Sequence, residues 1–467
     1  MSSVDTDTKA EPAPYQGKEI FVDQDEEQAV FKTGEGVTNY RTVSWPKASV
    51  IFLKLIFAVG VLSIPDNLHT LGAVGGSIVV VVWGLINTHL ALTMGDFVKK
   101  HPSVHTIADA AAIVGKKWKM STFLKEMFGV IYGLTWIFLS GASIIGVATA
   151  LNALSDHGAC TVVFAAVAMI GTIIFASFPR FGQIGVMTWI GFFLTYVAVL
   201  IVVIAVTQTD RPAAAPATGP YDLDFVAIAT PTFQSAMTAV STIFVSYAGV
   251  SAFMPIIAEM RRPQDYKKAV GCSMTLVTIS YLTFSLVVYA YCGQYVASPA
   301  LGSAGPTIKK VAYGIALPGL WITSILYLHL AAKYFFVRIL RNSKHLQSNS
   351  VVHWGTWFGS TIVCGILAFI VAEAIPFFGL LLGLIGALFL APSTLCIPPL
   401  MWFHDNQGLW RTTKIYKAKA AYYAFIFVLG LFVTVAGTYS AAVSIRDGYR
   451  ANTIGTAFSC ADNSGSS

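Results

Sequence analysis

The sequence predicts an all-helical integral membrane protein in which eleven helices cross the bilayer. Of its 467 residues, 55% are hydrophobic and only 11% are charged, whereas soluble domains carry about 25% charged residues. The hydrophobic residues gather in stretches long enough to cross a bilayer, which takes roughly 20 apolar residues. The first and the sixth of these stretches are interrupted by glycine, small residues and proline. Composition, span length and the paired interruptions together predict this fold class.

The predicted spans are joined mostly by short polar connections. They cover residues 48–71, 74–97, 126–151, 158–178, 182–206, 232–258, 269–292, 312–338, 354–374, 376–402 and 420–444. Residues 104–122 are amphipathic and too polar to cross, so we expect a helix lying at the cytoplasmic surface. The weakest boundary separates the ninth span from the tenth, where only Ile375 and Pro376 intervene after Glu373.

A Pro- and Ala-rich loop at 207–230 divides the chain into two halves. The expected organisation is a cytoplasmic tail at 1–45, a transmembrane domain at 46–444 with halves at 46–206 and 231–402 and an additional helix at 420–444, and an extracytoplasmic tail at 445–467. The polar first 45 residues lack the apolar core of a signal peptide, so the first span is expected to direct insertion.

Basic residues predict the orientation, because cytoplasmic loops are enriched in Lys and Arg. With the N-terminus inside, the N-terminal tail and the inner loops hold 23 basic residues, and the outer loops with the C-terminal tail hold 5. The inner loops are 98–125, 179–181, 259–268, 338–353 and 403–419. We therefore expect the N-terminus in the cytoplasm and the C-terminus outside.

Several functions are disfavoured by the sequence. The net charge of +7 comes from residues that flank apolar spans, whereas a nucleic-acid-binding protein clusters them on a soluble face. Walker A, GxSxG and HExxH patterns are absent from the sequence, so neither ATP-driven pumping nor hydrolysis is supported. The six cysteines show no metal-ligand or disulfide spacing, and we expect most to be small apolar residues. We expect no enzyme, cofactor or metal.

The first interruption, GVLSIP, runs from Gly60 to Pro65. Glycine weakens a helix, and proline removes a backbone donor and clashes with the preceding turn. Backbone groups freed at membrane depth must face protein or a water-filled cavity, because lipid cannot bond them. A plain proline kink is the alternative. The second interruption lies at 246–250 and is followed by Pro255. Broken spans at corresponding positions of two halves indicate the binding site of a secondary transporter.

The two breaks predict a site for the main chain of an α-amino acid. The free N–H groups near Ser63 suit a carboxylate, and the carbonyls released at Ala58 and around Phe244–Tyr247 suit an ammonium group. Neither break carries a charged side chain, so we expect a neutral substrate. The expected contacts are Ala58, Gly60, Val61, Leu62, Ser63, Phe244, Ser246, Tyr247, Ala248 and Gly249, with Tyr132 and Trp136 as a wall. For these two aromatic residues, packing or lipid contact is an equal alternative.

Three ionisable residues within spans are candidates for ion coupling, because charge in a membrane is costly. Lys54 either snorkels to the inner headgroups or places its ammonium where a sodium-coupled relative holds a cation. His329 and Lys333 share one helix face, with His329 as a proton-relay candidate and Lys333 as a second snorkelling candidate. For His89, Asp96, Glu259 and Glu373, ordinary interfacial roles are expected.

Five segments resemble the amino acid/auxin permease family, in particular fungal neutral amino-acid permeases. They are GVLSIP at 60–65, THLALTMGDF at 88–97, TIADAAAIVG at 106–115, EMRRPQDYKKA at 259–269 and LHLAAKYFFVRILR at 328–341. The resemblance implies a LeuT-like inverted repeat of five plus five helices with an eleventh appended, as in the APC superfamily. It also implies secondary uptake of neutral amino acids, usually with protons, through contacts at Gly60–Ser63 and Ser246–Gly249.

We therefore expect a multi-pass importer of neutral aliphatic or aromatic amino acids in the plasma membrane, driven by protons and functional as a monomer in the lipid bilayer. The alternatives within transport are a vacuolar exporter and a sodium-coupled carrier. A sensor on the same fold, which binds an amino acid without moving it, is the alternative from another functional class.

Overall fold

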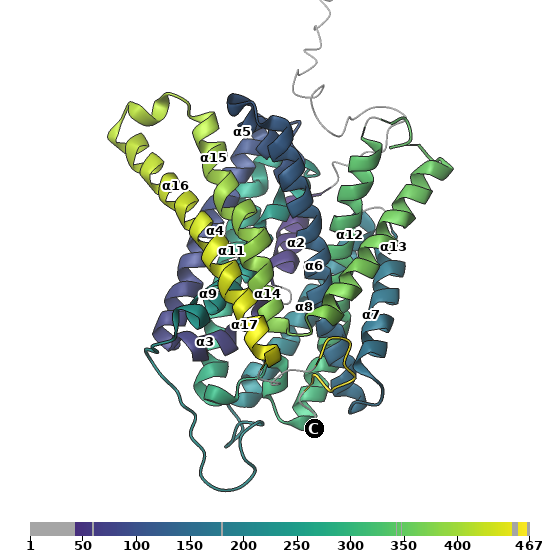
Figure 1. Cartoon of the computed structure of the whole chain (residues 1–467), viewed down its shortest axis with the longest axis vertical. Coiled ribbons are helices and arrows are strands. Elements are labelled where there is room, and N and C mark those ends of the chain that lie inside the picture. The colour runs from purple at the N-terminus through teal and green to yellow at the C-terminus, as the bar shows by residue number, and fades with distance from the viewer. Residues whose placement is uncertain are drawn as a thin grey trace, which may run out of the picture.

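The computed structural model describes residues 43–57, 60–178, 181–341, 343–346, 348–450 and 456–464. Their backbone is almost entirely helical (Figure 1), apart from the connections and one isolated bridge between Val43 and Met260. The all-helical class predicted from composition and span length is confirmed.

Ten helical segments of the described residues are long and apolar enough to cross a membrane. The helices that build them are α2 (Trp45–Ile56), α4 (Ala73–Lys100), α6 (Ser121–Ser155), α8 (Phe181–Val206), α9 (Phe233–Tyr247) with α10 (Phe253–Ala258), α11 (Tyr266–Cys292), α12 (Pro306–Leu340), α13 (Val351–Ala374), α14 (Phe378–Ile385) with α15 (Ile397–Asp405), and α16 (Lys414–Phe432) with α17 (Thr438–Arg450). The first segment ends at Leu62 and is followed by the short helix α3 (Ile64–Leu71). Short π-helical stretches join α14 to α15 and α16 to α17.

The fourth predicted span becomes α7 (Thr161–Ala176), which is apolar but has only 16 residues. At 1.5 Å per residue it is about 24 Å long, somewhat short of the roughly 30 Å hydrocarbon core. Its outer face carries Val163, Ile170 and Ile174, each more than half exposed. This face is as apolar as expected for a helix in contact with lipid.

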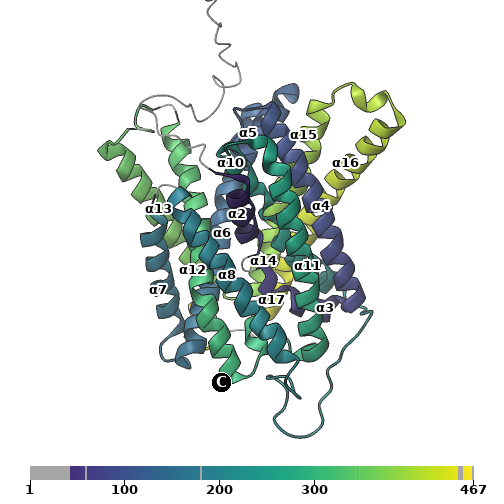
Figure 2. The same ribbon diagram turned by 180° about the vertical axis from the view of Figure 1, so that it is seen from behind.

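The broken helices lie inside the bundle. In the most apolar part of each segment, 94% of Phe233–Ala258 and 81% of Trp45–Leu62 is buried, against 33% of Lys414–Arg450. In the view from behind, α2 stands between α8 and α11 (Figure 2). The helices α6, α7, α12 and α13 pack against one another as a second group. The centre of the molecule is therefore made of the two interrupted spans.

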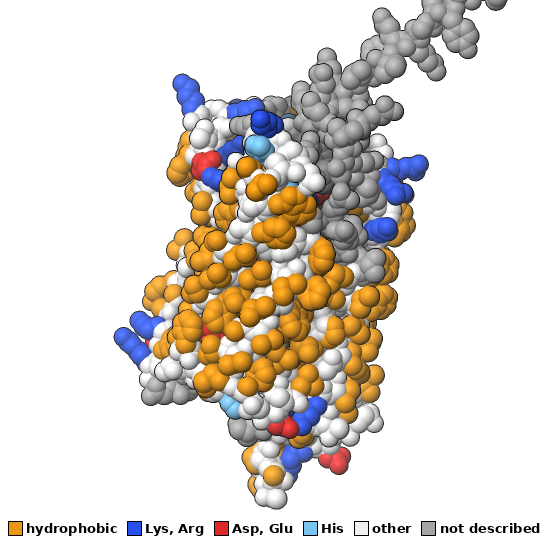
Figure 3. Space-filling model, turned by 90° about the vertical axis from the view of Figure 1, so that its right-hand side faces the viewer, with side chains coloured by type: hydrophobic (Ala, Val, Ile, Leu, Met, Phe, Trp, Pro, Cys, Tyr) orange, Lys and Arg blue, Asp and Glu red, His pale blue; other side chains and the backbone are white. Residues whose placement is uncertain are grey.

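Ion pairs gather the predicted inner loops at one end of the molecule. Lys267 at the start of α11 lies 3.1 Å from Asp96 near the end of α4, and Arg341 after α12 lies 2.9 Å from Asp109. At the opposite end, Lys310 lies 2.6 Å from Asp156. We call these the inner and the outer end, after the predicted orientation. A broad band of hydrophobic side chains lies between the ends, and most charged side chains in view lie toward them (Figure 3).

Two local expectations need correction. The amphipathic helix expected at 104–122 is shorter, α5 (Ile107–Gly115), and α6 begins at Ser121 instead of 126. A capping box between Thr106 and Asp109 fixes the start of α5, and its apolar face is buried against α6 and α15. The last helix runs on to Arg450, past the expected end at 444.

The cysteines also differ from expectation, because Cys160 and Cys460 form a disulfide. They are 300 residues apart, and only the fold brings the α6–α7 loop and the C-terminal tail together. The other four cysteines are free. Three of these, Cys292, Cys364 and Cys396, are buried among apolar residues as expected.

Glycines permit the close approach of the two broken helices. A Cβ atom at Gly60 would lie 2.7 Å from the Cα of Ser246, and one at Gly249 would lie 2.9 Å from the carbonyl oxygen of Leu55. Both contacts are with backbone atoms, so a side chain cannot be accommodated by a change of rotamer. Glycine at these positions is required for packing in this conformation.

We predict that Gly60→Val lowers the free energy of unfolding by about 1–3 kcal/mol, the usual cost of overpacking a core. Thermal unfolding of the purified protein in detergent measures this. Gly271→Val in α11 is the matched control, because a Cβ there meets open space. Equal unfolding temperatures for the two variants would contradict the packing role.

Candidate functional site

The candidate site lies where the two spans are interrupted. The first span leaves the helix after Ile56 and resumes through a 3₁₀ turn, Gly60–Leu62, before α3. The second leaves α9 after Tyr247 and passes through a 3₁₀ stretch, Ala248–Ala252, into α10. Real breaks are therefore present at both predicted positions, and a plain proline kink is excluded for the first. Ala58 lies outside the described residues.

Hydroxyl groups on neighbouring helices bond carbonyls at the breaks. The hydroxyl of Tyr281 lies 2.7 Å from the oxygen of Ile56 and 3.1 Å from that of Ser246, so it joins the two breaks. The hydroxyl of Tyr327 donates to the oxygen of Leu55 over 3.1 Å. Of the carbonyls expected to be free, that of Ser246 thus has a partner in this conformation, as buried backbone groups generally do.

Some of the predicted contact residues lie in the last turn of α9, and the others lie at the breaks. Phe244, Ser246 and Tyr247 still belong to the last turn of α9, and the Phe244 carbonyl accepts from the amide of Ala248. The Phe244 ring contacts Trp83 of α4, with centroids 4.7 Å apart. Ser246, Tyr247, Ala248 and Gly249 lie at or beside the break, as do Gly60, Val61, Leu62 and Ser63 of the first span, and all are buried.

Short-range hydrogen bonds fix the beginning of α3, which was expected to face a substrate carboxylate. Ser63 precedes the helix, and its hydroxyl donates to the oxygen of Gly60 over 2.9 Å. The side chain of Asn67 donates to the oxygen of Ser63 over 2.5 Å. The dipole of a helix places partial positive charge at this end. The carboxyl group of Asp66 also lies in this first turn, so the helix end and an acidic side chain lie together beyond the first break.

Aromatic side chains fill the space beside the breaks. Tyr132 and Trp136 of α6 are both buried, with ring centroids 5.7 Å apart. Trp136 also contacts Tyr327 at 5.6 Å, and Tyr247 contacts Tyr281 at 5.1 Å. Lipid contact for Tyr132 and Trp136 is excluded, and they pack inside the protein toward the breaks.

Two clefts approach this aromatic layer from opposite ends. The outer cleft has a volume of about 680 Å³ and is lined by α3, α6, α7, α9 and α14, including Asp66, Thr149 and Thr238. The inner cleft has a volume of about 540 Å³ and is lined by α5, α6 and α12, with Tyr132 among its walls. From Tyr132 to Ile145, the first α6 residue of the outer cleft, α6 rises about 20 Å. Among the residues that the structure describes, the two clefts share no lining residue, and Trp136 of the aromatic layer lies between the α6 residues that line them.

Lys54 is completely buried and bridges three helices. Its ammonium donates to the carbonyl oxygens of Gly191 (3.2 Å) and Gly319 (2.9 Å) and to the hydroxyl of Thr195 (3.2 Å). It thereby ties α2 to α8 and α12, and snorkelling is excluded. Such a ring of neutral oxygens is the donor set that hard cations prefer, and here the ammonium occupies its centre.

Glycine makes this arrangement possible. A Cβ at Gly319 would lie 2.3 Å from the hydroxyl oxygen of Thr195 and 2.8 Å from the oxygen of Gly191. The helices α8 and α12 can therefore approach until their carbonyls meet one ammonium group. Thr195, Gly191 and Gly319 were not predicted from the sequence, although glycine and threonine inside apolar spans are typical of close helix contacts in membranes.

His329 and Lys333 bond different neighbours. The Nδ1 atom of His329 lies 3.3 Å from the oxygen of Ala176 at the end of α7, and its ring packs edge-on against Trp357 of α13. Lys333 lies 2.8 Å from Glu259, which follows α10. Only 13% of the Lys333 side chain and 7% of the Glu259 side chain are exposed. Lys333 does not snorkel, and the interfacial role expected for Glu259 is replaced by this buried pair.

Charged side chains surround the inner cleft. Asp109 pairs with Arg341, and Glu126 pairs with Arg338. His105 also lines this cleft, and burial and the nearby positive charge of Lys333 lower its pKa to about 3. His105 is therefore neutral at physiological pH, so it does not add charge to the inner cleft.

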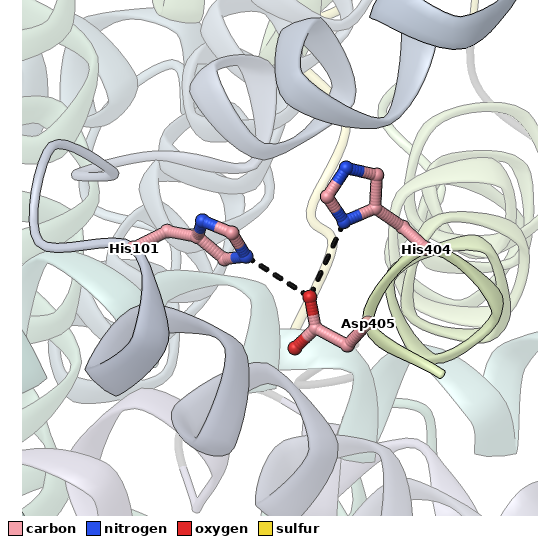
Figure 4. Close-up of side chains that lie close together, drawn as sticks. All are labelled: His101, His404 and Asp405. Carbon is pink, nitrogen blue, oxygen red and sulfur yellow. Dashed lines mark hydrogen bonds and ion pairs between the residues drawn. The ribbon is translucent and has the colours of Figure 1, made fainter. Parts of the chain in front are cut away.

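One group of side chains in the described part of the chain could hold a metal ion: His101, His404 and Asp405 (Figure 4). Both imidazole rings bond the same carboxylate oxygen, at 2.9 and 3.2 Å. Lys100 lies 3.3 Å from the other oxygen. The carboxylate thus already has three partners without a metal, and the group links the inner ends of α4 and α15.

Relatives of known sequence extend over nearly the whole chain. A 46% identical "transmembrane transporter" of Gibberella moniliformis matches 94% of this chain and 92% of its own length. The "N amino acid transport system protein" of Neurospora crassa is 29% identical, over 91% of this chain and 90% of its own.

Solved structures of similar fold are also transporters. Mhp1, a nucleobase-cation-symport-1 family transporter in a closed conformation with bromovinylhydantoin bound, aligns with a TM-score of 0.56 at 15% identity, over 94% of this chain and all of that one. MhsT in complex with L-phenylalanine aligns with a TM-score of 0.52 at 10% identity, over 85% and 97%. At these identities the likeness concerns the fold alone, and it confirms the expected LeuT-like arrangement.

The model of the family described as "transmembrane amino acid transporter protein" matches residues 41–442. This range contains both broken spans, the aromatic layer and Lys54. It also confirms the resemblance found in the five sequence segments. The chain belongs to the family of transmembrane amino acid transporter proteins.

Proposed function

We propose that this transporter imports neutral amino acids together with protons by alternating access. The family is one of amino acid transporters, and a relative is named as an amino acid transport system protein. The observation that carries the coupling part of the proposal is the buried Lys54 ammonium, which ties the first broken span to two neighbouring helices. A neutral substrate is favoured because neither break carries a charged side chain.

The substrate is proposed to bind between the breaks by its main chain. Its carboxylate would face the start of α3 near Ser63. Its ammonium would donate to the carbonyl oxygens that the hydroxyls of Tyr281 and Tyr327 now bond. Binding would then exchange one set of hydrogen bonds for another, so that no buried carbonyl is left unpaired. Entry requires the breaks to separate, because Gly60 now packs against Ser246.

Lys54 is proposed to couple proton movement to the position of α2. A charged ammonium forms stronger hydrogen bonds than a neutral amine, and its partners lie on α8 and α12. Loss of the proton would weaken the tie and allow α2 to move away from these helices. His329 of α12 remains a second candidate for carrying a proton, because it is buried and bonds Ala176 at the end of α7. Lys333 is proposed instead to hold the inner end closed, through Glu259.

The proposed location is the plasma membrane, with the N-terminus in the cytoplasm and one chain sufficient for the site. The excess of basic residues at the inner end supports this orientation. The disulfide at the outer end agrees with it, because disulfides persist in oxidising compartments. A vacuolar exporter and a sodium-coupled carrier are the alternatives within transport. The Lys54 ammonium weighs against sodium, since it already occupies the ring of oxygens.

Uptake into sealed liposomes tests the proposal. Purified protein should accumulate a radiolabelled mixture of neutral amino acids when an inward proton gradient is imposed. Accumulation should collapse with a protonophore and should not change when sodium replaces potassium. Binding without accumulation under any gradient would instead identify an amino acid sensor.

Replacing Lys54 tests the coupling. We predict that Lys54→Met abolishes gradient-driven accumulation and leaves the exchange of internal for external amino acid measurable. The oxygens of Gly191 and Gly319 lose the ammonium but keep the hydroxyl groups of Thr195 and Thr323 as donors. Neither oxygen is left unpaired, so the unfolding temperature should fall only slightly. Lys47→Met, at an exposed position of the same helix, is the control and should behave as wild type. Accumulation by Lys54→Met at the wild-type level would exclude a role of Lys54 in proton coupling.

Variants of the buried pair between Glu259 and Lys333 test whether this pair holds the inner end closed at α10. Glu259→Gln leaves Lys333 without its carboxylate, and breaking a buried pair costs roughly 3–5 kcal/mol. We expect a lower unfolding temperature and slower uptake. The double variant Glu259→Lys with Lys333→Glu should recover part of both. Unchanged stability of Glu259→Gln would mean that the pair contributes nothing to holding α10.

A further inference from the structure

The C-terminal tail does not hang free of the molecule. Residues 456–464, which we call the strap, lie at the outer end beside α7 and α13 (Figure 1). The Cys160–Cys460 disulfide joins the strap to the loop between α6 and α7. Hydrogen bonds fix it on both sides of this disulfide. The strap is thus an ordered part of the outer end, attached by a disulfide and by hydrogen bonds.

Four hydrogen bonds attach the strap to the group formed by α6, α7, α12 and α13. Asn463 accepts from Asn152 at the end of α6 over 2.8 Å, and the oxygen of Ala461 accepts from Thr161 of α7 over 2.7 Å. The oxygen of Ser464 accepts from Lys309 of α12 over 3.2 Å. The amide of Phe458 donates to the oxygen of Glu373 in α13 over 3.2 Å. These four helices pack against one another, so the strap is attached to a single packed group.

The strap also forms a wall of the outer cleft. Its lining residues are Thr456, Ser459, Ala461, Asp462 and Asn463. The facing wall is made by the outer halves of the broken spans, with Asp66, Asn67 and Thr70 on α3 and Thr238 and Thr242 on α9. The width of the outer cleft therefore depends on the distance between two walls. One wall is the strap, which a disulfide fixes, and the other is formed by α3 and α9 of the broken spans.

We propose that the strap is a size filter, which limits the bulk of molecules that can enter the outer cleft, and that the Cys160–Cys460 disulfide holds it in place. Its hydrogen bonds to Asn152, Thr161 and Lys309 are partly or fully buried, but each contributes only about 0.5–1.5 kcal/mol of net stability. Opening the disulfide should let the strap move and widen the entrance. For amino acids this inference rests on the proposed function, because it assumes that they enter from this end.

A labelling experiment tests the filter without requiring transport. Thr238→Cys places a reporter thiol in the cleft, in a background in which Cys272, the one exposed free cysteine among the described residues, is serine. Its reaction rate is measured with a small methanethiosulfonate reagent and with a bulky biotin-maleimide. The same measurements are made after Cys160→Ser and Cys460→Ser are introduced together.

The expected result is a several-fold faster reaction with the bulky reagent when the disulfide is absent, with little change for the small reagent. Ser103→Cys, in the inner cleft, is the matched reporter and should react equally in both backgrounds. Equal rates with the bulky reagent at Thr238→Cys would overturn the proposal. A parallel rise at Ser103→Cys would do so as well, because it would indicate general loosening of the fold.

A second variant acts in the opposite direction with the disulfide intact. Ser459→Trp adds bulk to the strap where it lines the cleft, and it should slow the bulky reagent more than the small one. Equal slowing of both reagents, or no effect, would contradict a filter at this position. In liposomes, removal of the disulfide should raise the uptake of tryptophan relative to alanine. Absence of all uptake by the wild type would overturn the proposed function but leave the labelling result valid.

Discussion

The structure depends on one constraint: a helix that is broken inside a membrane frees backbone groups, and these groups must find partners within the protein. Both breaks meet this constraint through the same side chain, since the Tyr281 hydroxyl lies between the oxygens of Ile56 and Ser246. Tyr327 bonds the neighbouring oxygen of Leu55. The breaks are therefore stabilised by two helices outside them, α11 and α12. A ligand that replaces these hydroxyls changes how four helices are joined.

The buried Lys54 obeys the same constraint as a donor, because its ammonium must find acceptors within the protein. A lone charge in a membrane interior is costly, and this one is stabilised by three oxygens from α8 and α12. Two of those oxygens belong to glycines, where the lack of a side chain permits close helix contact. The carbonyls at the breaks accept from neutral hydroxyls, whereas those beside Lys54 accept from a cation. A change of charge at this point thus acts directly on the attachment of α2.

Much of this arrangement could be predicted from the sequence. Hydrophobic stretches located the helices to within a few residues, because length and apolar composition are decided locally. The GVLSIP segment located the first break, since glycine and proline act on their own turn of helix. The second break begins at Ala248, two residues later than expected. The partners could not be predicted in the same way. The contact between Lys54 and Gly319 and the disulfide between Cys160 and Cys460 join residues 265 and 300 positions apart.

The long-range links lie in two groups, one within the helices that hold the strap and one between these helices and the broken spans. The strap is attached to α6, α7, α12 and α13, and it faces α3 and α9 across the outer cleft without being joined to them by the contacts described. The links across this division are reversible: Lys54 joins α2 to α12, and Glu259 after α10 pairs with Lys333 of α12. A covalent bond thus lies within one part, while hydrogen bonds and an ion pair join the two. The proposed alternating access requires such a distribution, in which the broken spans change position while the four-helix unit and its strap stay together.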